Sequence, residues 1–103
     1  MKYKKLIRDG LVAVLISPGF GAGWSTWAED KEVEGMLFDS RLIEALEKSP
    51  DELLRKAGEL YPDSYKSVKD VEIQWLPIGT IFWVEEYDGS ERIVTTEDKS
   101  YTA

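Results

Sequence analysis

One run of six aliphatic residues constrains the fold more than any other part of the sequence. Leu11–Ile16 (LVAVLI) stands between Gly10 and Ser17-Pro18, so turn-forming residues bound it on both sides. Its length and its β-branched side chains are typical of a strand that is buried on both faces. We therefore expect this segment to be an interior strand rather than a surface element.

Two helices are indicated by their N-terminal signals. Asp39 or Ser40 is the expected N-cap of the first helix. Ser49-Pro50-Asp51-Glu52 is a capping box with proline at the first helical position of the second. Pro62 ends the second helix because proline lacks the N–H that a helix interior needs. The apolar side chains expected in the core have helical spacing: Leu42, Ile43, Ala45 and Leu46, then Leu53, Leu54, Ala57, Leu60 and Tyr61.

The last third of the chain is expected to be β-structure. Val71, Ile73 and Trp75 alternate with polar residues, which is the period of a half-buried strand. Residues 80–87 and 90–96 flank Asp88-Gly89, a dipeptide typical of two-residue hairpin turns. One face of strand 80–87, which carries Trp83, is a candidate pocket wall or oligomer interface. The turn predicts three cross-strand pairs: Tyr87 with Ser90, Glu86 with Glu91 and Glu85 with Arg92.

The remaining segments complete the predicted order. Residues 2–9 (KYKKLIRD) are expected to form a short amphipathic helix that ends at Gly10. Residues 17–38 form a long connection with no clear period. We predict that residues 1–103 form a single domain of the α+β class. Its mainly antiparallel sheet of about four strands has two or three helices against one face.

A segment rich in glycine and tryptophan, residues 17–27 (SPGFGAGWSTW), is the first candidate binding site. Alternate glycines let backbone N–H groups converge on an anion, and aromatic rings offer flat faces to a nucleobase. The alternative is a tight loop whose tryptophans fill the core. The candidate ligand-binding residues of this loop are Ser17, Gly19, Phe20, Gly21, Gly23, Trp24, Ser25, Thr26 and Trp27.

A second candidate cluster lies at the predicted hairpin, residues 85–91 (EEYDGSE), and its candidate ligand-binding residues are Glu85, Glu86, Tyr87 and Asp88. Carboxylates there can accept hydrogen bonds from ribose hydroxyls and base amino groups, pair as acid and base, or bind a hard cation. The predicted register sets Glu86 opposite Glu91, a like-charge pair that costs stability unless a cation or a donor lies nearby. The alternative is a solvated hairpin tip whose charges prevent aggregation at a sheet edge.

Composition narrows the functions that these clusters can serve. The chain has 13 Lys and Arg against 20 Asp and Glu, a net charge of −7, which argues against general nucleic-acid binding. It has no Cys and no His, so we expect no metal site, no cofactor and no catalytic residues. The first ten residues are basic, and Arg8, with Lys4 and Lys5, is the expected cationic partner of an anionic ligand or of a neighbouring subunit's acidic face. The alternative for the lysines is the solvated surface of a short helix.

We expect no membrane association. No stretch approaches the roughly 20 apolar residues that a membrane-spanning helix needs. The N-terminus is only faintly similar to a signal peptide, because its apolar run is short and Ser17-Pro18-Gly19 is a poor cleavage site. The sequence is therefore interpreted as a mature protein, and the lack of Cys fits a reducing cytoplasm.

Two stretches, Val12–Trp27 (VAVLISPGFGAGWSTW) and Trp75–Glu91 (WLPIGTIFWVEEYDGSE), resemble a family of small uncharacterised proteins from tailed phages and prophages. Met36-Leu37-Phe38-Asp39, at the start of the first predicted helix, shares the resemblance. The family implies the cytoplasm of a bacterial host cell and no established activity. In kind rather than in motif, the chain is also similar to phage counter-defence proteins that sequester nucleotide second messengers at subunit interfaces without cleaving them.

Three functional hypotheses follow. The first is a non-catalytic phage counter-defence protein, a dimer or higher homo-oligomer. It would bind and sequester a small nucleotide-derived immune signal, such as a cyclic nucleotide or a cyclic ADP-ribose-like molecule. The alternative is an acidic protein–protein inhibitor or DNA mimic of a host defence enzyme, because the negative charge suits a basic partner. The third is a carboxylate- or metal-dependent hydrolase that uses Glu85, Glu86 and Asp88.

Overall fold

The strands form two antiparallel sheets in the computed structural model, which describes residues 3–19, 23–64, 66–95 and 101–103. The first sheet has the order β1-β2-β3 and comprises β1 (Ile7–Arg8), β2 (Leu11–Ile16) and β3 (Glu72–Pro77). The second has the order β5-β4-β6 and comprises β4 (Ile81–Tyr87), β5 (Ser90–Thr95) and β6 (Tyr101–Thr102). The predicted α+β class is confirmed, with the strands divided between two small sheets.

The helices lie between residues 25 and 60. They are α1 (Val33–Phe38), α2 (Ser40–Lys48) and α3 (Pro50–Leu60), preceded by two single 3₁₀ turns, η1 (Ser25–Trp27) and η2 (Asp30–Glu32). The N-caps are those expected: the Asp39 side chain accepts from the Arg41 N–H, and the Ser49 hydroxyl accepts from the Glu52 N–H. No helix in the described part of the chain is both long and apolar enough to cross a membrane.

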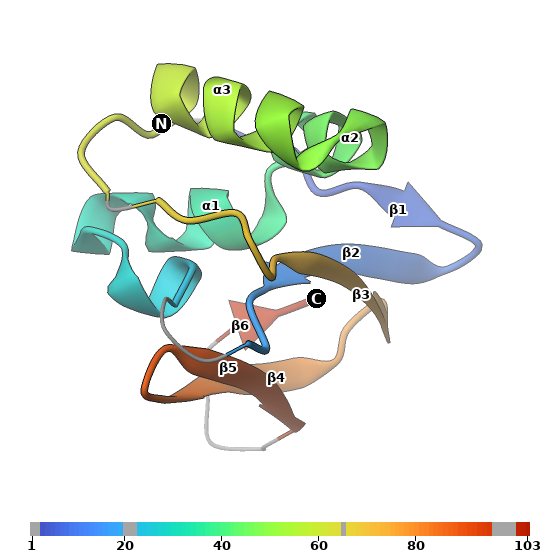
Figure 1. Cartoon of the computed structure of the whole chain (residues 1–103). Coiled ribbons are helices and arrows are strands. Elements are labelled where there is room, and N and C mark those ends of the chain that lie inside the picture. Colours follow the sequence, from blue (N-terminus) through green and yellow to red (C-terminus); the bar gives the residue numbers. More distant parts are fainter. Residues whose placement is uncertain (1–2, 20–22, 65, 96–100) are drawn as a thin grey trace.

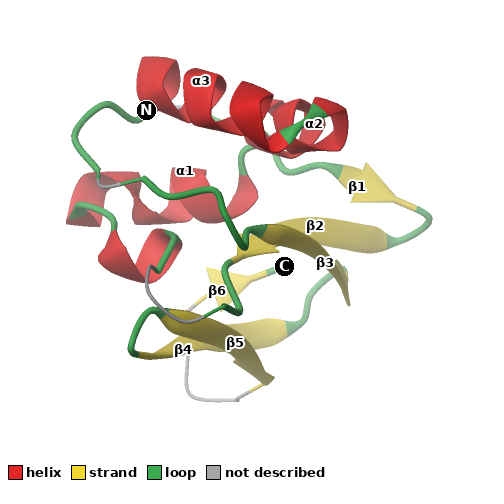
Figure 2. Cartoon of the chain, viewed as in Figure 1, coloured by secondary structure: helices red, strands yellow, loops and turns green. Residues whose placement is uncertain are grey.

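The central strand β2 is covered on both faces, as its sequence predicts. Ala13 and Leu15 pack in one core cluster with side chains of α2 and α3. Val12, Val14 and Ile16 pack in a second cluster with α1 and with Phe82 and Val84 of β4. Figures 1 and 2 show the resulting arrangement: α2 and α3 lie over one face of the first sheet, and the second sheet lies on the opposite side of the first sheet.

The prediction of a short helix over residues 2–9 is wrong. Ile7 and Arg8 instead form β1, which pairs with Val12 and Leu11 across a tight turn at Asp9-Gly10. Both turn residues have positive φ, 52° for Asp9 and 78° for Gly10, as a two-residue hairpin turn requires. An aspartate–glycine dipeptide is therefore a hairpin signal here, and it outweighs the weak helical pattern that precedes it.

Two further expectations need correction. Residues 17–38 are not an irregular connection, because η1, η2 and α1 occupy their second half. Leu54, expected in the core, is 44% exposed, because the buried face of α3 runs through Leu53 and Ala57.

The predicted hairpin register is confirmed at all three pairs: Tyr87 with Ser90, Glu86 with Glu91 and Glu85 with Arg92.

Candidate functional site

The glycine-rich loop does converge its backbone N–H groups on an anion, and that anion is the side chain of Glu91. The Glu91 carboxylate accepts from the N–H groups of Ser17 at 2.9 Å, Trp24 at 2.6 Å and Thr26 at 3.0 Å. The Thr26 hydroxyl also donates to it, at 2.6 Å. Glu91 is only 1% exposed. These loop amides therefore anchor β5 to the end of β2.

The hairpin register places two like charges, Glu86 and Glu91, opposite each other, and this pairing requires hydrogen-bond donors or a cation nearby. Glu86 and Glu91 lie opposite each other, and each carboxylate has its own hydrogen-bond donors. Glu86 accepts from the Gly89 N–H at 2.7 Å, within the turn. The like charges are thus held by separate donors, as the pairing requires.

The tryptophans of the loop have different surroundings. Trp24 is fully buried, and its indole N–H donates to the Met36 carbonyl at 2.7 Å, so it packs in the core. Trp27 is partly exposed on η1. Gly23 is required for close packing, since a Cβ there would lie 2.6 Å from the Thr26 hydroxyl oxygen. Phe20 and Gly21 lie outside the described residues.

Arg8 lies apart from the loop. It pairs with Leu11 at the start of β2, whereas Ser17 follows the other end of that strand. Its guanidinium makes two hydrogen bonds to the Glu47 carboxylate, at 2.5 and 2.8 Å, and lies 5.5 Å from the Trp75 ring centre. The structure thus gives Arg8 partners in α2 and β3.

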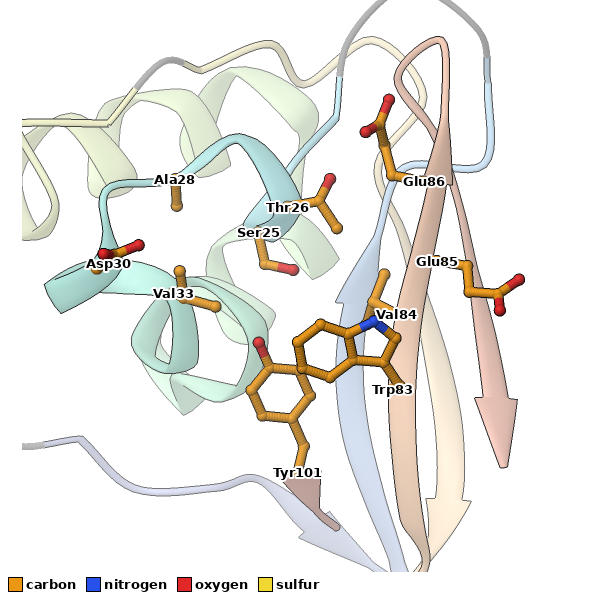
Figure 3. Close-up of a pocket in the computed structure, with 10 residues that line it drawn as sticks. All are labelled: Ser25, Thr26, Ala28, Asp30, Val33, Trp83, Val84, Glu85, Glu86 and Tyr101. Carbon is orange, nitrogen blue, oxygen red and sulfur yellow. The ribbon is translucent and has the colours of Figure 1, made fainter. Parts of the chain in front are cut away.

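The loop and the acidic hairpin do meet, at a groove of about 590 Å³ beside β4. We call it the β4 groove (Figure 3). One wall comes from the segment of η1, η2 and α1, through Ser25, Thr26, Ala28, Asp30 and Val33. The other wall comes from the second sheet, through Trp83, Val84, Glu85, Glu86 and Tyr101.

Two stacked aromatic rings form one end of the β4 groove. The Trp83 indole lies on the Tyr101 ring with centroids 5.3 Å apart and an interplanar angle of 8°. Trp83 is 42% exposed, so much of the indole remains open to a ligand. Burial, and next the negative charges of Glu34 and Glu91, raise the pKa of the Tyr101 phenol, which stays neutral.

The polar lining of the β4 groove accepts hydrogen bonds. Asp30 and Glu86 supply carboxylates, and Ser25 and Thr26 supply hydroxyl oxygens. Glu85 directs its carboxylate away from Thr26 (Figure 3). The Arg92 guanidinium donates to that carboxylate at 2.6 Å. Among the described residues that line the groove, none is Lys or Arg. The groove suits a flat group that carries hydrogen-bond donors.

The other predicted site residues lie outside this groove. Tyr87 is 75% exposed at the end of the hairpin and, with Arg92, lines a smaller hollow of about 290 Å³. Asp88 occupies the turn with a φ of 51°. Gly19 packs against Asp70, whose carboxylate oxygen a Cβ would approach to 2.2 Å.

Several groove residues were not among the predicted site residues. Trp83 had a signal, since its strand face was a candidate pocket wall. Asp30, Val33 and Tyr101 had none, because their sequence context indicates no binding motif. Within the described residues, no group of three or more carboxylates lies close enough to hold a metal ion.

Comparisons of the chain with protein families, with curated proteins and with solved structures gave no match.

Proposed function

We propose that this protein is a non-catalytic binding protein that holds a planar, amino-bearing group, such as the base of a nucleoside, in the β4 groove. The observation that carries the proposal is the stacked pair Trp83–Tyr101 beside carboxylate and hydroxyl acceptors. An open indole stacks on any base, and such stacking contributes about 1–3 kcal/mol. Acceptors next to the stack suit exocyclic amino groups and ribose hydroxyls.

The chemistry of the lining favours the base and ribose of a nucleotide over its phosphate. Three amides of the loop, those of Ser17, Trp24 and Thr26, already bind Glu91, and Arg8 binds Glu47. Binding without turnover is supported by composition, since the chain has neither His nor Cys for acid–base or nucleophilic chemistry. The setting, a phage protein that removes a bacterial immune signal, comes from the sequence resemblance alone.

The test is calorimetric titration with nucleosides and cyclic dinucleotides, with each ligand recovered for mass analysis. Trp83→Ala should weaken binding roughly 5- to 150-fold, the range expected for one lost base–aromatic stack. Tyr87→Ala is the matched control, because Tyr87 is an exposed aromatic residue of the same strand outside the groove. Equal losses in both variants, or a chemically altered ligand, would contradict the proposal.

A protein partner is the second candidate function. It is favoured by the net charge of −7 and by the large side chains exposed on the outer face of β4, namely Ile81, Trp83 and Tyr87. A basic nucleic-acid enzyme is the expected partner class. Inhibition of such an enzyme should weaken steeply as salt rises to physiological strength, because the attraction is long-range. Inhibition that does not change with salt would count against this candidate.

A further inference from the structure

Ser25 contributes the most buried polar side chain among the described residues that line the β4 groove. It belongs to η1, which packs against β4, and it is only 1% exposed. The groove carboxylates of Asp30 and Glu86 belong instead to exposed residues. Val84, 4% exposed, supplies the buried part of the opposite wall. Ser25 and Val84 therefore form the floor of the groove.

The Ser25 hydroxyl is open to the groove. In the part of the chain that the structure describes, no group makes a hydrogen bond to its Oγ. Every enclosed side-chain nitrogen or oxygen atom of the described residues does have a partner, so an Oγ without one is not enclosed by protein. Figure 3 shows this hydroxyl pointing from η1 toward the β4 wall.

The proton of this hydroxyl distinguishes Ser25 from the other oxygen-bearing side chains beside it. The Thr26 hydroxyl donates its proton to Glu91 at 2.6 Å, so Thr26 has only lone pairs to offer a ligand. The carboxylates of Asp30 and Glu86 only accept hydrogen bonds. A ligand that covers the Ser25 hydroxyl must offer it an acceptor, because a covered hydroxyl without a partner is unfavourable.

We infer that Ser25 determines which rings the β4 groove accepts: its hydroxyl donates to a ring nitrogen of the base that stacks on Trp83. The inference rests on the proposed function. It narrows the ligand class to amino-substituted heterocycles that keep an unprotonated ring nitrogen, as adenine does. The floor suits the ring rather than the ribose, because the side chain of Val84 beside Ser25 is apolar. The ring's amino group is left to the carboxylates nearer the surface.

The test combines a ligand series with one substitution. The probes are adenosine and its 1-deaza, 3-deaza and 7-deaza analogues, each of which replaces one ring nitrogen by C–H and keeps the amino group. One analogue should bind the wild type roughly 5- to 150-fold more weakly than adenosine, because the buried hydroxyl then stays unpaired. Ser25→Ala should weaken adenosine binding by a similar factor and should bind adenosine and that analogue equally.

Ser67→Ala is the matched control. Ser67 lies in the segment between α3 and β3 and does not line the groove, so this variant should bind all four nucleosides as the wild type does. If Ser25→Ala keeps the wild-type affinity for adenosine, or if no deaza analogue loses affinity, the inference is overturned. A loss on Trp83→Ala would still support the proposed function in that case. If no nucleoside binds the wild type, both fail.

Urea unfolding separates ligand recognition from structural support. Since no described residue bonds to the Ser25 Oγ, Ser25→Ala should unfold at the same urea concentration as the wild type or at a higher one. A lower midpoint together with equal losses of affinity for all four nucleosides would show that Ser25 only holds η1 in place. That result would also overturn the inference.

Discussion

At the scale of single residues, Glu91 joins three segments through one carboxylate. Its partners are the N–H groups of Ser17, Trp24 and Thr26, all close to or within the core. A buried N–H that loses its acceptor costs about 1–3 kcal/mol. The stability of the loop and of the second sheet therefore depends on Glu91, the last residue of the acidic hairpin cluster, which was not among the predicted ligand-binding residues.

Glu91→Gln should lower the free energy of unfolding by about 1–3 kcal/mol, because an amide NH₂ then faces backbone donors. Urea unfolding followed by tryptophan fluorescence measures the loss. Glu86→Ala is the control, since Glu86 lies opposite Glu91 and accepts one hydrogen bond near the surface. It should cost about 1 kcal/mol or less. A Glu91→Gln variant as stable as Glu86→Ala would show that the loop does not depend on the carboxylate.

Asp39 makes the stability of the protein depend on pH. Burial alone raises the pKa of its carboxyl, but hydrogen bonds from Arg41 and Tyr61 outweigh burial and hold the pKa below the usual value. Burial and the Asp39 carboxylate raise the pKa of the Tyr61 phenol, which remains a donor.

A carboxyl whose pKa is lower in the folded state binds fewer protons there than in the unfolded state. Its contribution to stability is therefore present above the unfolded pKa of about 3.9 and is lost as the pH falls from about 5 through the folded pKa. Urea unfolding between pH 7 and pH 3 should show this loss in the wild type. Asp39→Asn should be less stable at pH 7 and should show a shallower acid slope. An unchanged slope would exclude Asp39 as its source.

At the scale of elements, two helical glycines have opposite roles. Gly35 of α1 lies against Tyr61, and a Cβ there would approach the Tyr61 hydroxyl oxygen to 2.2 Å. Gly58 of α3 has open space around it, with nothing within 4 Å of such a Cβ. The first glycine permits close packing, whereas the second only costs conformational entropy.

Gly35→Ala should therefore destabilise the protein by about 1–3 kcal/mol through overpacking. Gly58→Ala should stabilise it by about 0.5–1 kcal/mol, because alanine is the better helix former. Thermal unfolding of both variants gives the comparison. A gain in stability from both substitutions would show that Tyr61 moves away from α1 without cost.

Local signals explain which elements could be predicted. Asp39 and Ser49 cap their helices through atoms two or three residues away, and Asp88-Gly89 sets the β4–β5 register by itself. The N-terminal strand β1 is only two residues long and depends on pairing with β2, so its own pattern does not reveal it.

The candidate site was predictable only in part, because local sequence signals reveal some of its residues and tertiary contacts bring in the others. Backbone N–H groups of the glycine-rich loop do converge, but the donors are Ser17, Trp24 and Thr26 rather than the glycines, and their acceptor lies 65 to 74 residues from Thr26 and Ser17, beyond the reach of any spacing argument. The β4 groove joins Ser25 and Thr26 to Glu86, which were predicted, and to Tyr101, which gave no signal.

At the scale of the whole molecule, the net charge of −7 acts on every ligand that approaches the groove. Adenosine should bind more tightly than its 5′-monophosphate at low salt. The ratio of the two dissociation constants should approach one as salt rises from about 10 to 500 mM, because screening removes the repulsion. Titration calorimetry at both salt concentrations measures it.

If the 5′-monophosphate binds more tightly than adenosine at low salt, a phosphate site lies elsewhere on the molecule. Tighter binding of the monophosphate, lost at high salt, would require a cationic pocket. The structure offers one such place, a hollow of about 430 Å³ lined by Tyr3, Lys4, Ser40 and Arg41. Substitution of Lys4 by Glu would then abolish the advantage of the phosphate.

The bond between the loop and Glu91 also has a consequence for biosynthesis. A ribosome makes the loop amides of Ser17 and Thr26 long before it adds their acceptor, which follows 74 and 65 residues later. Contacts of such long range form late and slow the folding of small domains. A stalled nascent chain that lacks the β4–β5 hairpin should therefore stay open to proteases in its glycine loop, whatever the state of its helices.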